Sequence, residues 1–370
     1  MASPVSDRRW KHAALVRHGP LEAFSAPSGT DLWGASDWHR PVLRATGRVA
    51  FDFKPLNSGI QFTFDVPHVQ GIGSNSDMLR KKAKYAKIAI CLILGFLLFT
   101  TTYLSLWGRL FPFSPVIVGF SKQEGDRAII YAEVDVHFEN LALIDQCIVS
   151  VEQAHGLAFK QKPEIFLLKT PAKFQRLTGS TVRFKTFPVY GRVLVSPHAL
   201  EEADKGLISL PIYLKHELSH SLLFQHMTLY RFFKYPIWLL EGIATQSSGM
   251  MGHAWYPDKK ATHDLIREGN FLPPRDFGTK NEDATLLKVP NKAAFVYSEF
   301  ACIVDDLMDN YGREKVLAYI KALFNGSDDL ELFRATFRRT FGDYLSDFQR
   351  RINQGAQRGR TSAASGDTKK

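Results

Sequence analysis

The chain has 370 residues, 45% of them hydrophobic, so it can build at least one domain with a sizeable core. Residues 1–87 contain 13 Lys and Arg against 7 Asp and Glu, and residues 355–370 contain 4 against 1, which leaves the body between them nearly neutral at +1. Because a nucleic-acid-binding domain concentrates basic residues on its folded surface, this distribution argues against nucleic acid as a partner.

Residues 1–77 carry scattered Arg and His without a sustained helical period. Two alternating stretches, 49–53 and 60–66, are compatible with a hairpin, and the glycine-rich stretch 71–76 is typical of a linker. We expect residues 1–77 to be either a small cytoplasmic appendage or a segment upstream of the native start, since a chain beginning at Met78 would open as signal-anchored proteins do.

Residues 88–107 contain no charged side chain, and as a helix they are long enough to cross a hydrocarbon core of about 30 Å. Five basic residues lie just upstream: Arg80, Lys81, Lys82, Lys84 and Lys87. Positive charge stays on the cytoplasmic side, and no small-residue cleavage site follows the apolar run. The sequence therefore predicts an uncleaved signal-anchor over 78–107, with residues 108–354 outside the cytoplasm.

The exported part has the pattern of an α+β domain, with strands first and helices afterwards. Residues 142–156 have helical spacing, and 163–170 and 191–197 are predicted strands. Seven later segments have helical spacing: 208–225, 237–247, 257–268, 293–311, 313–324, 328–340 and 343–353. The polar residues 355–370 are predicted to be a disordered tail.

Three cysteines do not make a disulfide framework. Cys91 lies in the apolar run, and Cys147 and Cys302 lie in helical patterns among apolar neighbours. We expect free thiols, with a Cys147–Cys302 bridge as the alternative, because two exported thiols can pair.

The stretch HELSH, residues 216–220, holds the candidate metal-binding and catalytic residues. His216 and His220 are four residues apart, so on a helix they share a face and can grip one ion. Zinc accepts neutral imidazole nitrogens, and a catalytic zinc keeps three protein ligands and a water. Glu217 can then take the proton from the metal-bound water. Since most other residues of this helix are apolar, these polar groups need partners, which a metal would supply.

Two residues compete to be the third ligand. His226 has the spacing found in HExxHxxGxxH motifs, but Leu223 occupies the glycine position, and a continuous helix would turn His226 away from His220. Glu241 lies in a second predicted helix that opens after Pro236. Glu241 is the favoured candidate, and His226 stays open as the alternative.

HELSH, with Glu241 in WLLEGIA (238–244) after 20 intervening residues, resembles the gluzincin zinc peptidases, which include thermolysin and the zinc aminopeptidases. More narrowly, residues 125–353 are similar to the peptidase MA-like metallohydrolases of bacteria. The resemblance implies a zincin-like fold with a small sheet followed by a mostly helical half, with Zn²⁺ held by His216, His220 and Glu241 and with Glu217 as general base. It also implies a peptide or protein substrate.

The chain departs from these families in two ways. The exopeptidase signature of the aminopeptidases is absent, and Thr245 stands where thermolysin-like enzymes have an aspartate that braces a histidine ligand. Tyr297 lies where the aminopeptidases keep a catalytic tyrosine, which makes it the candidate for stabilising the oxyanion; His253 and His263 are alternatives. The strand 191–196 is a candidate for pairing with an extended substrate.

The predicted function is a membrane-anchored, extracytoplasmic zinc metallopeptidase of bacterial type. The alternative from another class is a non-catalytic zinc-containing envelope protein, in which the same fold serves as a scaffold or binding module.

Overall fold

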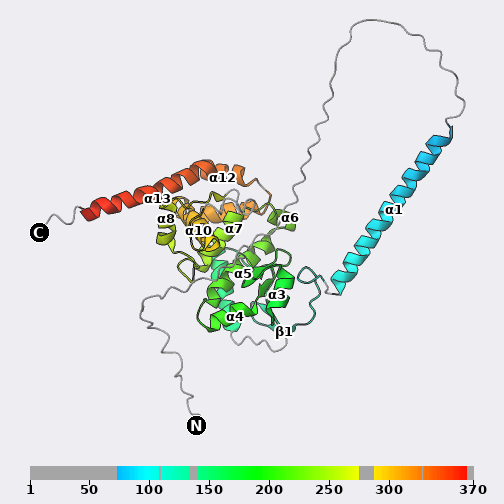
Figure 1. The fold of residues 1–370 in the computed structure, drawn as a ribbon, viewed down its shortest axis with the longest axis horizontal. Coiled ribbons are helices and arrows are strands. Elements are labelled where there is room, and N and C mark those ends of the chain that lie inside the picture. Colours follow the sequence, from blue (N-terminus) through cyan, green and yellow to red (C-terminus); the bar gives the residue numbers. More distant parts are fainter. Residues whose placement is uncertain (1–72, 108–109, 134–140, 275–286, 327, 365–370) are drawn as a thin grey trace, which may run out of the picture. The chain divides into compact units, whose positions relative to one another are not determined.

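A computed structural model describes residues 73–107, 110–133, 141–274, 287–326 and 328–364 (Figure 1). The predicted hairpin at 49–66 and nearly all of the predicted appendage lie outside these residues. So do the last six residues of the predicted tail.

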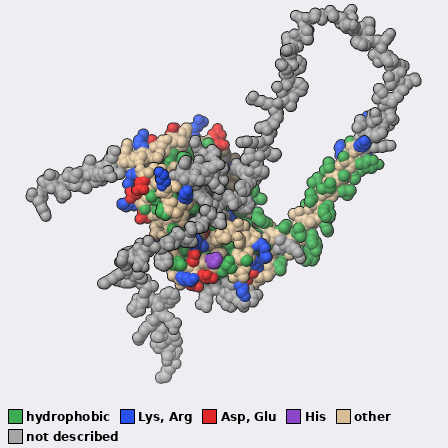
Figure 2. All heavy atoms as spheres, viewed as in Figure 1, with side chains coloured by type: hydrophobic (Ala, Val, Ile, Leu, Met, Phe, Trp, Pro, Cys, Tyr) green, Lys and Arg blue, Asp and Glu red, His purple; other side chains and the backbone are tan. Residues whose placement is uncertain are grey.

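The first described element is a single long helix, α1 (Gly73–Leu106). It begins inside the stretch predicted to be a linker. Residues Lys82–Leu106 are long and apolar enough to cross a membrane, and Figure 2 shows hydrophobic side chains along most of the helix with basic ones towards its start. The rings of Tyr103 and Trp107 stack at its far end, with centroids 4.8 Å apart.

A five-stranded sheet forms the first half of the domain, in the order β1-β2-β3-β5-β4. The strands are β1 (Ser121–Glu124), β2 (Ile129–Ala132), β3 (Glu164–Leu167), β4 (Phe184–Thr186) and β5 (Val193–Val195). The pairs β2/β3 and β3/β5 are parallel, and the outer strands β1 and β4 are antiparallel to their neighbours. Two of these strands, β3 and β5, lie within predicted strands.

Helices dominate the rest of the domain. In chain order they are α2 (Leu141–His155), α3 (Pro171–Thr178), α4 (Pro197–Asp204), α5 (Leu210–His226), α6 (Leu229–Phe232), α7 (Ile237–Ser248), α8 (Lys259–Arg267), α10 (Lys292–Tyr311), α11 (Arg313–Leu323), α12 (Asp329–Phe337) and α13 (Phe341–Ala364). The described part is therefore a mixed α/β domain with a small sheet and a helical half. Helix α13 continues past residue 355 to Ala364, where a disordered tail was expected.

Helix α5 is shared by two hydrophobic cores. Its Leu218 and Leu222 belong to the core between the sheet and α2, while Leu223 and Phe224 belong to the core built around α7 and α10. Figure 1 shows α5 between the part labelled α3 and α4 and the part labelled α7 and α10. A helix that is covered from two sides must be apolar on most of its surface, which explains its unusual sequence.

Cys147 and Cys302 are free and buried, as predicted, and the alternative of a bridge between them is wrong. Burial raises the pKa of the Cys147 thiol to about 11 and raises that of Cys302 as well. Both therefore act as small apolar core residues.

Candidate metal centre

Helix α5 brings three polar side chains of HELSH into a largely apolar interior. It opens with Pro211 in its first turn, a position where the missing N–H costs nothing. Two contacts fix its position. The Ser221 hydroxyl donates to the carbonyl of Gly191 over 2.6 Å, and Ser219 Oγ lies 2.7 Å from Nε2 of the buried His155 on α2.

His216, His220 and Glu241 converge on one point. The two Nε2 atoms lie 3.1 Å apart, and Glu241 Oε2 lies 3.3 Å from that of His216 and 3.4 Å from that of His220. The three side chains are only 7%, 9% and 12% exposed. Three potential ligand atoms, one from each side chain, therefore lie close together as a triangle, in a site that is nearly closed to solvent.

Close packing between helices α7 and α10 positions Glu241 at the triangle. Glu241 lies on α7, which follows Pro236 and ends at Gly249 in the left-handed conformation. At Gly242, next to Glu241, a Cβ would lie only 2.7 Å from the carbonyl oxygen of Phe300 on α10. The glycine thus lets α10 lie directly on α7, and α10 carries Tyr297.

The electrostatics of the triangle keep the Glu241 carboxyl ionised. Burial opposes ionisation of Glu241, but the neighbouring imidazoles outweigh it and lower the pKa of that carboxyl. Burial likewise opposes a charge on His220, yet Glu241 raises the pKa of its imidazole. The carboxylate is therefore held in its ionised form, which is the form that binds metal.

The donor set fits a zinc-type ion. Glu241 Oε2 is buried and accepts no hydrogen bond from the described residues. In a tetrahedral zinc site, ligands at about 2.0–2.1 Å from the ion are separated by roughly 3.3–3.4 Å. The three observed separations are close to that spacing. Two imidazole nitrogens and one carboxylate oxygen can therefore hold one such ion without rearrangement.

Glu217 lies beside the triangle and is fixed by a residue of the sheet. Its Oε2 lies 2.5 Å from the hydroxyl oxygen of Thr186, on strand β4. Glu217 is half-buried, while Thr186 is only 8% exposed. Glu217 is thus partly exposed to solvent, and one of its carboxylate oxygens is bonded to Thr186.

Tyr297 also lies at the site. Its ring stacks on that of His216, with centroids 6.2 Å apart and planes inclined by 12°. Burial, followed by the charges of Glu241 and Glu217 and the nearby Tyr256, raises the pKa of its phenol well above the usual range. The hydroxyl therefore keeps its proton and can donate it in a hydrogen bond.

Two further tyrosines near Glu217 were missed by the sequence reasoning. Burial raises the pKa of Tyr256, with additional contributions from Tyr213, Glu241 and Glu217. Tyr213 lies one turn before Glu217, and its ring meets that of Tyr256 edge-on at 6.4 Å. The spacing of Tyr213 on the helix was a usable signal, whereas Tyr256 follows α7 in a turn and had none.

The alternative ligands and donors lie elsewhere. His226 Nε2 lies 2.9 Å from the carbonyl oxygen of Ala158, and its ring stacks on Phe324. His253 is exposed, and His263 contacts Phe348 edge-on. Thr245 is buried, and its hydroxyl finds no partner among the described residues, nor does Nδ1 of either His216 or His220.

Among the described residues, the sheet edge near the site is β4, which pairs only with β5, and not the predicted strand 191–196. β5 is paired on both sides, with β3 and with β4, so its backbone groups are already used. The expectation that 191–196 pairs with a substrate is therefore wrong. It failed because β4 is only three residues long and gives no clear alternation in the sequence.

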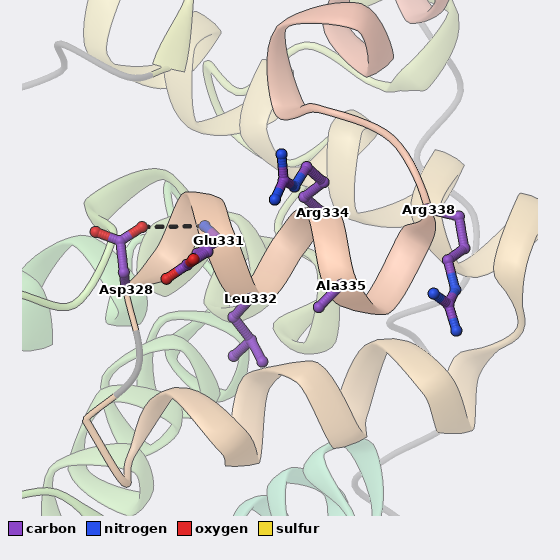
Figure 3. Close-up of a pocket in the computed structure, with 6 residues that line it drawn as sticks. All are labelled: Asp328, Glu331, Leu332, Arg334, Ala335 and Arg338. Carbon is purple, nitrogen blue, oxygen red and sulfur yellow. Dashed lines mark hydrogen bonds between the residues drawn. The ribbon is translucent and has the colours of Figure 1, made fainter.

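A separate hollow of about 680 Å³ lies along α12 (Figure 3). It is lined by Asp328, Glu331, Leu332, Arg334, Ala335 and Arg338. Asp328 accepts the N–H of Glu331 over 3.0 Å as the cap of the helix, so its carboxylate has a structural role. None of these residues belongs to α5, α7 or α10, and the hollow is not part of the metal centre.

Comparisons with known proteins add little to this geometry. No protein-family model matches the chain, and no curated protein matches it in sequence. Among solved structures, the chain is similar to the M1 zinc metallopeptidase from Deinococcus radiodurans, with 15% identity and a TM-score of 0.36. The match covers 63% of this chain and 50% of that one, so this chain spans about half of that protein. A likeness of this extent assigns neither fold nor activity.

Proposed function

We propose that the chain is a membrane-anchored zinc metallopeptidase that hydrolyses peptide bonds outside the cytoplasm. The observation that carries the proposal is the convergence of His216, His220 and Glu241 with Glu217 beside them. These four residues supply a metal site and a base, which together are the minimum for hydrolysis with an activated water.

His216, His220 and Glu241 would hold the ion. When bound there, zinc lowers the pKa of a water and polarises a carbonyl oxygen. Glu217 accepts the proton of the attacking water on the oxygen that Thr186 leaves free, and later delivers it to the leaving amine. The Tyr297 phenol, which keeps its proton, donates a hydrogen bond to the developing oxyanion.

The edge of β4 suggests how a peptide binds. Phe187 N–H donates to Arg192 and Ser196 N–H donates to Arg183, so in this antiparallel pair the odd-numbered residues of β4 face β5. The backbone groups of Phe184 and Thr186 therefore point towards the open edge. An extended peptide can add to that edge as a further strand, with its backbone beside Glu217.

The test is the variant Glu217→Gln, which keeps the shape of the side chain and removes the base. We expect hydrolysis of casein or of a quenched peptide library to fall by at least about 100-fold, the lower range for loss of a general base. Zinc content measured by plasma mass spectrometry should stay at that of the wild type. Retained hydrolysis in this variant would remove Glu217 from its role.

The rival function is a zinc-containing scaffold or binding module of the envelope. It predicts bound zinc and no turnover by the wild-type protein on any peptide of a diverse library. The open β4 edge and the accessible Glu217 favour the peptidase, because a purely structural zinc needs neither.

A further inference from the structure

We propose that Thr186 is a positioning residue that couples docking of a peptide on the β4 edge to the orientation of Glu217. The inference rests on the proposed peptidase function and names a component that the zinc-binding motif does not contain. Thr186 is 31 residues away from Glu217 in the chain, yet it makes the shortest contact of that carboxylate.

The side chain of Thr186 is a rigid donor. Its Oγ1 lies 2.5 Å from Glu217 Oε2 and 3.2 Å from the main-chain oxygen of the same residue. A hydroxyl has one proton to give, and an ionised carboxylate only accepts, so the shorter contact is the hydrogen bond. Because a β-branched side chain in a strand has few rotamers, this bond fixes the carboxylate and leaves Oε1 for the water.

The backbone N–H and C=O of Thr186 are placed to bond to a peptide strand and not to Glu217. Thr186 is paired opposite Val193 at a position without hydrogen bonds to β5, so its N–H and C=O point away from β5, to the edge that no other described strand covers. A peptide strand that adds to this edge would bond to the same residue whose hydroxyl holds the base. Docking of the substrate and alignment of Glu217 therefore share one rigid residue.

The surroundings keep Thr186 in place. The β4–β5 turn is tied to α5 by the hydrogen bond from Ser221 to the carbonyl of Gly191. At Gly191, a Cβ would lie 2.9 Å from Ser221 Oγ, so the turn touches the helix closely. Since Ser221 directly follows the proposed ligand His220, this hydrogen bond fixes the position of β4 relative to the proposed metal ligands.

Two substitutions separate the hydroxyl from the shape of the side chain. Thr186→Val keeps the branched shape and removes the donor, and we expect kcat to fall by roughly 10- to 100-fold, as for loss of a hydrogen bond to a charged group. KM should change by less than about twofold, because the backbone edge is intact. Thr186→Ser keeps the donor and should recover kcat to within about fivefold of the wild type. Thr181→Val, at an exposed threonine just before β4, is the matched control and should behave as the wild type.

Zinc content, the thermal midpoint and a crystal structure accompany the kinetics. We expect Thr186→Val to keep its zinc and its midpoint, and to show the Glu217 carboxylate rotated or split between two orientations. A valine variant that hydrolyses peptides as fast as the wild type, or a serine variant that is not rescued, overturns the inference while Glu217→Gln still defines a peptidase. A valine variant without zinc also overturns it, in favour of a structural role. If the wild-type protein binds zinc and cleaves nothing, the proposed function and this inference fall together.

Discussion

At the scale of single residues, the candidate metal centre depends on one carboxylate oxygen. Glu241 Oε2 completes the triangle with the two imidazoles, and it accepts no hydrogen bond from the described residues. His226, the other candidate, already has the carbonyl of Ala158 and the ring of Phe324 as partners. A buried carboxylate oxygen that accepts no hydrogen bond is costly unless a cation neutralises its charge.

This contrast gives a paired prediction. Glu241→Gln should weaken zinc binding by more than about 100-fold, because even changes to the outer partners of metal ligands cost about 10–100-fold. His226→Gln can still donate to Ala158 and should bind zinc within about threefold of the wild type. Competition with a fluorescent zinc chelator measures both variants. Equal affinity of the two would show that Glu241 is not a ligand.

The residues of the site differ in how far the sequence could predict them. His216, Glu217 and His220 share one helical turn, and Glu241 lies in the next long helix, so local spacing was enough to propose them. Tertiary packing alone brings Thr186 into contact with Glu217 and places Tyr256 where the charge of Glu217 affects its pKa, and a lone threonine or tyrosine carries no spacing signal. What the sequence could not supply was the long-range part of the site.

At the scale of elements, the contact between α7 and α10 positions both Glu241 and Tyr297. The two helices touch at Gly242, where the space for a side chain is filled by the backbone of Phe300 and the side chain of Val304. Interiors packed this densely do not absorb an added methyl group. The orientation of both site residues is therefore sensitive to this one position.

Gly242→Ala should accordingly lower the free energy of unfolding by about 1–3 kcal/mol, the usual cost of overpacking, although alanine favours helix. It should also weaken zinc binding, since Glu241 is the next residue. The control is Gly342→Ala on α13, where a Cβ meets no atom within 4 Å and stability should hold or rise. Chemical denaturation of both variants checks this; a Gly242→Ala variant as stable as the wild type would mean that the helices are not in contact there.

Most of the long helices were predictable from the sequence, whereas the short strands were less so. Six of the eight helices expected in the domain have starts and ends within two residues of the observed bounds, because apolar periodicity and capping residues define them locally. Helix α12 ends three residues earlier than expected, and α13 begins earlier and ends later. Strands β1, β2 and β4 were missed, since three or four residues show too little alternation. The sheet order, which decides that β4 is the free edge, follows from pairing between distant segments.

At the scale of the whole molecule, the proposed anchor would set the compartment in which the proposed peptidase works. Lys82–Leu106 has the length and composition of a span, and basic residues precede its apolar part. We therefore propose that the chain is held in the membrane by this helix with its start in the cytoplasm, which would place the metal centre outside.

This arrangement is tested by fractionation and by protease access. The full chain should stay with membranes in alkaline carbonate, while a variant lacking residues 78–107 should be soluble and still bind zinc. Protease added to intact spheroplasts should degrade the part after residue 108. Release by carbonate would contradict the anchor, and protection of the domain in intact spheroplasts would contradict the orientation.

The central claim is that two imidazoles and one carboxylate from adjacent helices hold a single divalent cation. The most direct measurement is anomalous diffraction at the zinc absorption edge from crystals of the zinc-loaded protein. The account predicts one peak bonded to Nε2 of His216, Nε2 of His220 and Oε2 of Glu241. Diffraction with no peak at that point, or with Glu241 turned away and another residue bonded to the ion, would contradict it.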